Sequence, residues 1–308
     1  MKRTLDYIYK QRVAVVVMLF VLVLVSCEKE VKINLANGDS RIVVEGAIET
    51  NVPPYVFLTK SIGYFAKIDL NTLQNSFVHN AVVTVSNGSK TVTLKEYSLD
   101  TGGTGAKLYF YSVDTSLPPS EWMIGEVDRS YTLTIESEGK TYQAITKIPN
   151  PTQLDSVNTA IPSIIPDNNP DVREIKVFFK DPDTLGNYMR YFTKRNSEGY
   201  FPGLNSVYPD ELINGTLFQT TLAAGENRNT IGDTGFDSLG FFHPGDTVTL
   251  KWCAIDKGVY DFYSTFEFAI GTIGSPFASP ISVKTNVNNN ALGIWAGYGT
   301  IYKTLIIE

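Results

Sequence analysis

The chain has 308 residues, of which 43% are hydrophobic and 12% aromatic, so it is long enough and apolar enough to fold around a sizeable core. Its formal net charge of −6 argues against a nucleic-acid-binding protein, because phosphate recognition needs clusters of Lys and Arg. An acidic body is also not drawn to anionic lipid headgroups, so any attachment to a membrane must come from a separate anchor.

The N-terminus has the pattern of a secretory signal. A basic stretch opens the chain, an uninterrupted apolar run covers 13–25, and Ser26 and Cys27 follow. The run is too short for a transmembrane helix, and a small residue before a cysteine resembles the lipobox of bacterial lipoproteins. We therefore predict a lipoprotein signal peptide at 1–26, acylation of Cys27 and a lipidated tether over 27–40. An ordinary signal peptide or an uncleaved anchor is the alternative.

The residues after the cysteine indicate where the protein is anchored. Glu28-Lys29-Glu30 resembles the signal that sends lipoproteins to the outer face of the outer membrane in Bacteroidetes-type bacteria. We predict a protein that contacts the outer membrane through the lipid on Cys27 and is exposed on the cell surface. The periplasmic face of the same membrane is the alternative.

The first half of the chain reads as a series of short strands. They are rich in Val, Ile, Thr and Tyr, and turn pairs such as Asn87-Gly88 and Glu138-Gly139 separate some of them. The predicted strands are 41–48, 55–59, 81–85, 91–94, 107–111, 131–135 and 141–145. Regular short strands without a long helix predict an immunoglobulin-like antiparallel β-sandwich over 41–150.

The second half is predicted to be a separate β-rich domain. Ile148-Pro149-Asn150-Pro151 interrupts the strand pattern and favours a domain boundary near residue 150, with the second domain over 151–308. Its predicted strands are 174–180, 188–193, 247–253 and the tail 286–307. The fold class is therefore mainly β.

One amphipathic helix is predicted in this second domain, near 256–270. Its apolar stripe consists of Val259, Phe262, Tyr263, Phe266 and Ile270, which share one helix face. Asp256 is a suitable N-cap. The helix is expected to pack its stripe against the strands of the domain.

The sequence does not mark a catalytic centre. The two histidines, His79 and His243, belong to no metal-binding pair, and no G-x-S-x-G elbow is present. Apart from Cys27 the only cysteine is Cys253, in a predicted strand, where a buried and inert thiol is expected. We predict a protein that is not an enzyme and has no cofactor, metal or catalytic residues.

Two loops carry polar or aromatic residues that suit binding. Asp181, Asp183 and Asn187 have a spacing that a calcium loop uses, but the favoured interpretation is a polar turn whose side chains bond the local backbone. A long loop with Tyr200, Phe201 and Tyr208 is the candidate ligand or interface loop, because aromatic faces suit sugars and protein partners. Local packing that holds the loop down is the alternative.

Several segments together resemble one family. They are Val43-Val44-Glu45-Gly46, the Asp181-Pro182 to Tyr188 turn, Gly245-Asp246-Thr247-Val248 and Tyr260-Asp261-Phe262-Tyr263. Their order and spacing over nearly the whole mature chain resemble the DUF4249 family, lipoproteins of unknown function from Bacteroidetes.

The resemblance implies a function only by association. Members are described beside TonB-dependent outer-membrane transporters, and the family has no assigned catalytic residues. It therefore implies a non-enzymatic binding or accessory component of nutrient uptake, with such a transporter as the possible partner. A surface carbohydrate hydrolase with unidentified carboxylates, or a structural or adhesive surface module, is the alternative.

Overall fold

The computed structural model describes residues 39–63, 66–101, 105–165, 169–211, 214–227, 240–273, 275, 279 and 281–308. The predicted signal peptide, Cys27 and most of the tether lie outside the described residues. The segment Asp39–Glu308 forms one compact unit. It is mainly β with one helix packed on the sheet, as predicted.

The elements follow one another in this order: β1 Ile42–Glu49, β2 Tyr55–Lys60, α2 Leu70–Ser76, β3 Val82–Ser86, β4 Thr91–Asp100, β5 Lys107–Ser112, the short 3₁₀ helix Pro119–Glu121, β6 Arg129–Ser137, β7 Lys140–Ile148, β8 Leu154–Ala160, β9 Glu174–Lys180, β10 Tyr188–Arg195, β11 Phe201–Tyr208, β12 Leu217–Leu222, β13 Thr247–Ile255, α3 Lys257–Gly271 and β14 Leu292–Ile306. The predicted domain boundary near residue 150 falls between β7 and β8 and stays a prediction.

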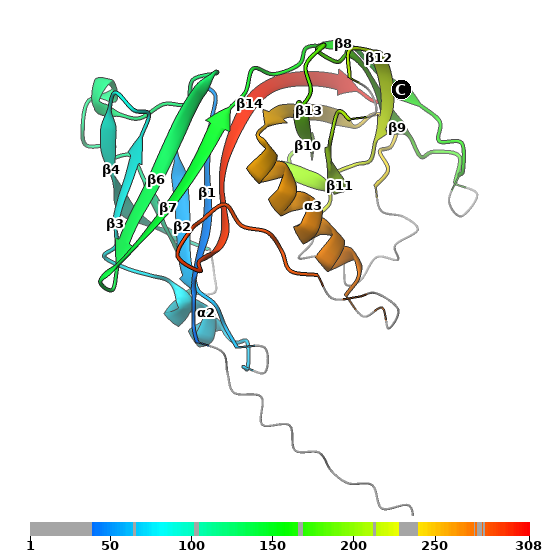
Figure 1. Ribbon diagram of the computed structural model, residues 1–308. Helices are drawn as coiled ribbons and strands as arrows, with labels where there is room; N and C mark the ends of the chain where they lie inside the picture. Colours follow the sequence, from blue (N-terminus) through cyan, green and yellow to red (C-terminus); the bar gives the residue numbers. More distant parts are fainter. Residues whose placement is uncertain are drawn as a thin grey trace, which may run out of the picture. The chain divides into compact units, whose positions relative to one another are not determined.

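A mixed sheet of eleven strands runs through both halves of the sequence, in the order β11-β10-β13-β14-β1-β2-β5-β4-β3-β6-β7. The first strand joins the halves, because β1 pairs with β2 on one side and with the last strand, β14, on the other (Figure 1). The pairing with β14 is parallel and sets Gly46 opposite Trp295. Strands β12, β9 and β8 form a second, smaller sheet.

The N-terminal part of the large sheet encloses a core of alternating side chains. Tyr131, Leu133 and Ile135 of β6 are completely buried, because every second residue of a strand faces the same side. Figure 1 shows β6 and β7 crossing in front of β1 and β2. On this inner side β7 lies against β14, where the backbone N–H of Gly297 donates to the Thr146 hydroxyl at 2.8 Å.

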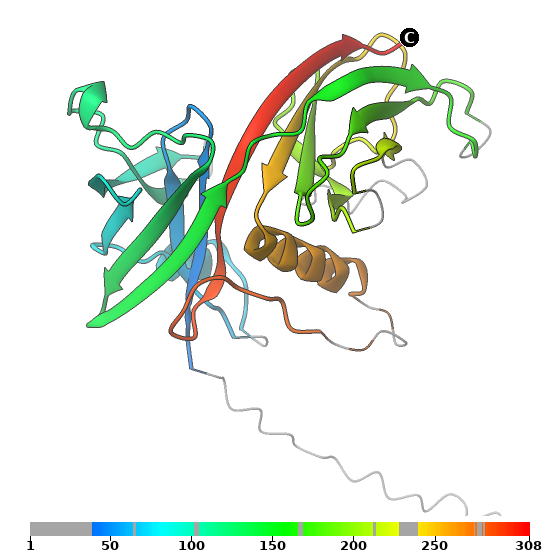
Figure 2. The same ribbon diagram turned by 45° about the horizontal axis from the view of Figure 1, so that its top comes forward.

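The C-terminal part consists of three layers. In β13, Val248, Leu250 and Trp252 face the smaller sheet, whereas Cys253 and Ile255 face the opposite side and pack with α3. Figure 2 shows α3 as a separate layer next to the strands. Period-two alternation within one strand therefore supplies two different cores.

The predicted helix is confirmed as α3, and its cap ties it to the rest of the molecule. Asp256 accepts a hydrogen bond from the backbone N–H of Val259 at 2.9 Å. Its other carboxylate oxygen accepts from the Thr146 hydroxyl at 2.7 Å and from the Lys147 backbone N–H at 2.8 Å. The N-cap thus fixes the start of the helix and also anchors it to β7.

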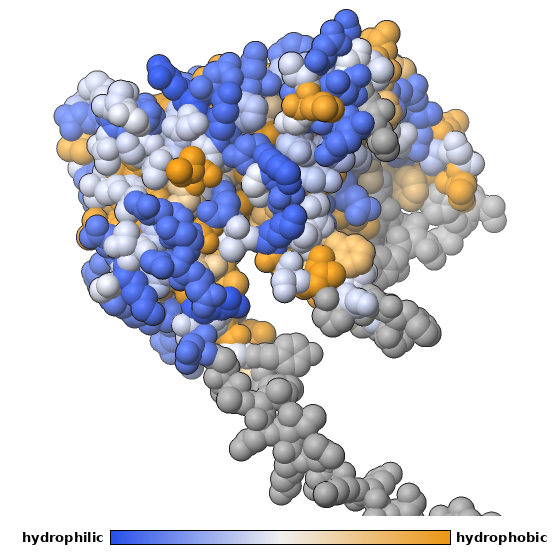
Figure 3. Space-filling model, in the orientation of Figure 1, coloured by the Kyte–Doolittle hydropathy of each residue, from blue (hydrophilic) through white to orange (hydrophobic). Residues whose placement is uncertain are grey.

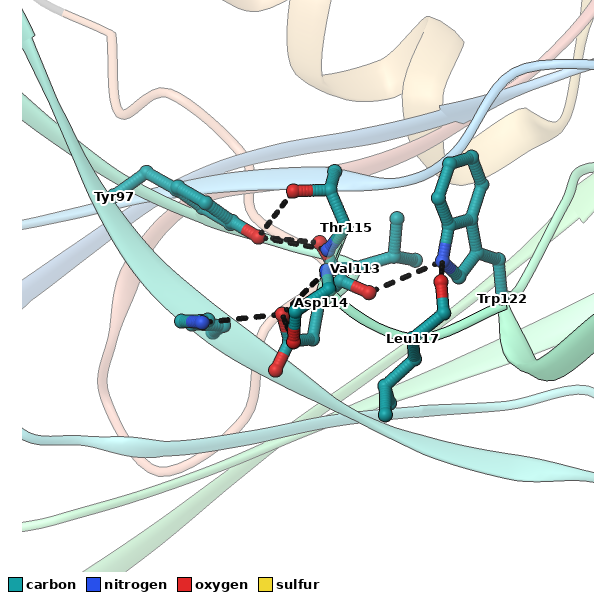
Figure 4. A network of polar contacts seen from close by, with 8 residues as sticks. Tyr97, Val113, Asp114, Thr115, Leu117 and Trp122 are labelled. Carbon is teal, nitrogen blue, oxygen red and sulfur yellow. Dashed lines mark hydrogen bonds and ion pairs between the residues drawn. The ribbon is translucent and has the colours of Figure 1, made fainter. Parts of the chain in front are cut away.

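A polar network holds the segment after β5 in place (Figure 4). The hydroxyl of Tyr97 donates to the carbonyl of Val113 at 3.0 Å and accepts from the backbone N–H of Thr115 at 2.9 Å. The indole N–H of Trp122 bonds the carbonyls of Asp114 and Leu117 at 3.1 and 3.0 Å. Side chains thus satisfy backbone groups that no strand pairs, which stabilises this loop.

Sequence reasoning missed five elements: α2, the 3₁₀ helix Pro119–Glu121, β8, β11 and β12. The most informative of these is β11, because the sequence predicted a long aromatic loop where the structure has a strand. Residues Phe201–Tyr208 form the edge strand of the large sheet, paired with β10. Pro202 is tolerated because an edge strand has a side without ladder hydrogen bonds. Gly203 is required because a Cβ there would lie 1.9 Å from the Tyr191 hydroxyl.

The surface is largely hydrophilic on the face that Figure 3 shows, with hydrophobic residues scattered singly or in small groups. Scattered apolar residues of this kind are normal for a folded protein. Within the described part of the chain, no helix has the length and the apolar character needed to cross a membrane.

Candidate functional site

A cleft of about 390 Å³ lies between α3 and one face of the sheet. Its size falls in the range of small-molecule sites. The residues that line it are Glu45, Ala47, Glu49, Val52, Pro53, Tyr55, Arg190, Phe192, Tyr200, Pro202, Lys251, Tyr263, Phe266, Glu267 and Tyr298. They come from β1, β2, β10, β11, β13, α3 and β14 and from two adjoining turns.

Local periodicity explains why these side chains meet. Glu45, Ala47 and Glu49 alternate along β1, so all three point to the side of the sheet that α3 covers. Arg190 and Phe192 are related in the same way on β10. The parallel register of β1 and β14 then places Glu49 opposite Tyr298, so residues from the two ends of the chain form one wall.

Arg190 is the centre of the buried polar side of the cleft. Its guanidinium donates to the Ser206 hydroxyl at 3.1 Å and to the Tyr298 hydroxyl at 2.8 Å. It lies 4.0 Å from the carboxylate of Glu267, which also accepts from the backbone N–H of Ser206 at 2.8 Å. Burial acts to lower the pKa of Arg190, but Tyr298, Tyr263 and Glu267 outweigh it and raise the pKa. The guanidinium therefore stays charged.

The rings around Arg190 hold its position. The guanidinium carbon lies 3.2 Å from the ring centroid of Tyr263 and 4.6 Å from that of Phe192. Cation–π contacts of this kind favour a charged group that has left water. Hydrogen bonds and ring contacts together leave Arg190 with one orientation, so it is a preorganised part of the wall.

Lys251 forms the second charged pair of the cleft. Its ammonium group pairs with Glu49, which also accepts a hydrogen bond from the hydroxyl of Tyr302. The ammonium lies 5.2 Å from the ring centroid of Phe192 and 5.6 Å from that of Tyr298. A positive and a negative group thus neutralise each other within the wall, as in the pair of Arg190 and Glu267.

Glu45 differs from these paired residues. Among the described residues, no hydrogen bond or ion pair engages its carboxylate, which is open to the cleft. The surrounding protein atoms nevertheless remove enough water to raise its pKa, and the charge of Arg190 opposes this only in part. Glu45 is the carboxylate that is available to a ligand.

Two of the aromatic residues are open enough to receive a ligand. Tyr55 and Tyr200 each expose 41% of their surface, and burial raises the pKa of the Tyr55 hydroxyl, so it stays a neutral donor. Ring faces combined with polar groups fix the orientation of small polar ligands with apolar faces. The arrangement suits binding by stacking and hydrogen bonding.

The predicted candidate ligand or interface residues, Tyr200, Phe201 and Tyr208, do not share one site. Tyr200 lines the cleft. Phe201, the next residue, lines a different hollow beside Gly225. Tyr208 packs on Tyr191, with ring centroids 6.1 Å apart, at the edge of a hydrophobic core.

Sequence reasoning missed Glu45, Arg190, Lys251 and Glu267 as site residues. Arg190, Lys251 and Glu267 interrupt segments that are otherwise apolar: Arg190 and Lys251 in predicted strands and Glu267 in the predicted helix. A charged residue within a buried segment is a signal, because it must find a partner. No pattern in the sequence indicates which partner.

The two histidines and Cys253 lie outside the cleft, in contacts that hold the fold together. His79 bonds Glu96, and the backbone of His243 bonds Asp246 in a turn. Cys253 is free and buried, as predicted, and burial raises its pKa to about 11. Neither histidine lines the cleft.

Comparison with known families gives one match. A family model described as a domain of unknown function, DUF4249, matches residues 28–303. No curated protein matches the chain.

Proposed function

The chain belongs to the DUF4249 family, whose function is unknown, and from this premise we propose a non-enzymatic binding protein that holds a small polar ligand in the cleft. The observation that carries the proposal is the pairing of charges within the wall. Because Arg190 and Lys251 are already paired with Glu267 and Glu49, these four side chains need no charge from a ligand, and the carboxylate of Glu45 can accept its hydrogen bonds. Exposed ring faces beside polar groups suit a short glycan.

The sequence motif extends the proposal to the cell envelope. Acylation of Cys27 would hold the folded body at the outer membrane of a Bacteroidetes-type bacterium, on the surface if Glu28-Lys29-Glu30 acts as an export signal. The family resemblance adds a TonB-dependent transporter as the partner that would receive the ligand.

Binding is tested with a panel of oligosaccharides by calorimetry. For a glycan that binds, Tyr200→Ala and Tyr55→Ala should each weaken the affinity about tenfold, which corresponds to about 1.4 kcal/mol. Tyr109→Ala on β5, outside the cleft, is the matched control and should bind normally. Binding that is unaffected by both cleft variants would place the site elsewhere.

The anchor and the partner are tested in cells. Cys27→Ala should leave a folded protein that moves from the outer membrane to the periplasmic fraction, and a palmitate label should be lost. Retention of the variant in the outer membrane at wild-type levels would contradict the lipid anchor. Mild-detergent purification from outer membranes should recover a transporter, and recovery of no envelope protein would count against that partner.

A carbohydrate hydrolase is the second candidate, and the three carboxylates of the cleft favour it. Glu45 has a raised pKa, as a general acid needs, while Glu49 and Glu267 are engaged by basic partners. Hydrolysis of a bound glycan that stops in Glu45→Gln would support the enzyme. Binding without hydrolysis in the wild-type protein would support the proposal above.

A further inference from the structure

Two buried aspartates lie outside the cleft, one after β9 and one after β11. Asp181 follows β9 directly and Asp210 lies two residues after β11, and the side chains of both have a relative exposure of 0%. Burial raises the pKa of Asp181, the Gly215 amide partly offsets this, and the charges of Asp210 and Asp183 raise the pKa further. The charge of Asp210 thus disfavours the ionised form of Asp181.

These side chains present oxygens that nothing satisfies. Both carboxylate oxygens of Asp181, Oδ1 of Asp210 and Oδ1 of Asn214 are buried and have no hydrogen-bond partner among the residues that the structure describes. An ionised carboxylate that leaves water without a partner is strongly unfavourable. These four unsatisfied oxygens therefore require a positive charge or protons.

The loops that carry these oxygens hold one another. The backbone N–H of Asp181 donates to the carbonyl of Thr216 at 2.9 Å, and that of Gly215 donates to Pro182 at 3.3 Å. The backbone N–H of Asn214 donates to the carbonyl of Asp210 at 3.0 Å. Backbone hydrogen bonds thus connect the loop after β9 to residues 215 and 216, and Asn214 to Asp210.

The backbone at Gly215 also lies close to a third carboxylate, that of Asp183. Its φ is +71°, and a Cβ there would lie 2.3 Å from the Oδ1 atom of Asp183. Glycine allows both the backbone conformation and the proximity of that third carboxylate. The Asp183 side chain therefore stands against the same turn that carries Asn214.

The polar turn that the sequence favours accounts for Asn187 but not for Asp181. The side-chain amide of Asn187 bonds the carbonyl of Thr184, as such a turn requires, and also Asp210 at 3.2 Å. For Asp181 the interpretation is wrong, because neither of its oxygens bonds the local backbone. Asn187 occupies only one oxygen of Asp210, Oδ2, and leaves the other available.

We infer that Asp181, Asp210 and Asn214 bind a calcium ion. All the available groups are hard oxygens, and two carboxylates match a divalent charge. Calcium accepts mixed carboxylate, amide and water ligands from irregular loops, whereas magnesium demands near-ideal octahedral geometry. Among the described residues, no group of three or more His, Cys, Asp and Glu side chains is placed to hold a metal. Because only two of the proposed ligands are charged, we expect weak binding, with a Kd of about 0.1–1 mM.

The test is the thermal midpoint of the purified full-length protein in EDTA and in about 10 mM calcium chloride. At a tenfold excess over Kd the midpoint should rise by about 4 °C, because the ion binds only the folded state. Terbium, with luminescence excited through nearby tyrosines such as Tyr188, should bind and be displaced by calcium. A midpoint that moves by less than about 1 °C, without displacement of terbium, would overturn the inference.

Isosteric variants locate the effect. Asp181→Asn and Asp210→Asn should each abolish the calcium response and, in EDTA, raise the midpoint, because the repulsion between the carboxylates is removed. Asp171→Asn, at an exposed aspartate in another loop, is the matched control and should keep the full response. A response that persists in both site variants would overturn the assignment even if calcium stabilises the protein.

Discussion

The cleft and the calcium site bury charge in opposite ways. In the cleft, Arg190 and Lys251 stand beside Glu267 and Glu49, so acids and bases balance within the chain. At the calcium site, Asp181 and Asp210 have no ion pair with any described basic residue. In the first region both basic side chains have acidic partners and Glu45 is left for a ligand, whereas the second region needs a positive charge from outside the chain.

The comparison separates two roles for buried charge. A completed network preorganises a surface, because its dipoles and rings keep their positions before a ligand arrives. Carboxylate oxygens without a basic partner favour the binding of a cation. Without the cation, the repulsion between them destabilises the folded protein. Variants that remove one charged group at a time measure how much each group contributes.

The largest effect is expected for Arg190→Met. Loss of the guanidinium removes a positive charge beside the buried carboxylate of Glu267, so the free energy of unfolding should fall by about 3–5 kcal/mol. Urea unfolding measures this. Arg129→Met, which breaks an exposed pair with Glu126, should cost at most about 1 kcal/mol. Equal losses in the two variants would refute the central position of Arg190.

Lys251→Met should have the next largest effect. Glu49 is half-buried and would keep only the bond from Tyr302, so the loss should be about 1–3 kcal/mol. The same urea titration applies. Lys303→Met on β14 removes an exposed lysine and should change little. If the two lysine variants unfold alike, the pair with Glu49 contributes no stability.

Glu45→Gln should change how the free energy of unfolding depends on pH. At acid pH, where Glu45 is protonated, it should change that free energy little. The folded state raises the pKa of Glu45 above its ordinary value of 4.5, so stability falls as the pH rises from about 4.5 through the folded-state pKa. The variant should flatten that decline in urea midpoints, whereas exposed Glu136→Gln on β6 should not. An unchanged profile in Glu45→Gln would show that the cleft leaves this carboxyl hydrated.

The smallest effect is expected for Asp114→Asn, in the exposed network of Figure 4. Hydrogen bonds from the Ser116 backbone and hydroxyl, and the bond from Lys95, lower the pKa of Asp114 below 3.8. The stability it provides is present above pH 3.8 and is lost as the pH falls through the lowered pKa. The variant should lose only this acid-range dependence. A large loss at neutral pH would show that the loop controls global unfolding.

Local pattern in the sequence was enough for most of the strands and for the longer helix. The stripe from Val259 to Ile270 and the cap at Asp256 predicted α3, and the strand around Cys253 was found from its β-branched and aromatic residues. By contrast, Tyr200-Phe201-Pro202-Gly203 has the composition of a turn. Pairing with β10 and the approach of Tyr191 override that composition, and neither is visible locally.

The cleft could not be predicted because its parts are far apart in the sequence. Glu45 and Tyr298 lie at opposite ends of the chain and meet only through the register of β1 with β14. Tyr200 carried a local signal as an aromatic ring in a polar context. Arg190, Lys251 and Glu267 carried one as charged residues in apolar segments, but none of these signals indicates a partner. For the calcium site, the sequence showed Asp181, but its partner Asp210 depends on how two loops meet.

The pairing of β1 with β14 also constrains the order of folding. Val43 pairs with Leu292 and Glu49 with Tyr298, so the second strand pairing of β1 must wait until almost the whole chain is present. Contacts between such distant segments slow folding, because a very long loop must close before they form. A chain still emerging from a ribosome would therefore remain incompletely folded until its last strand arrives.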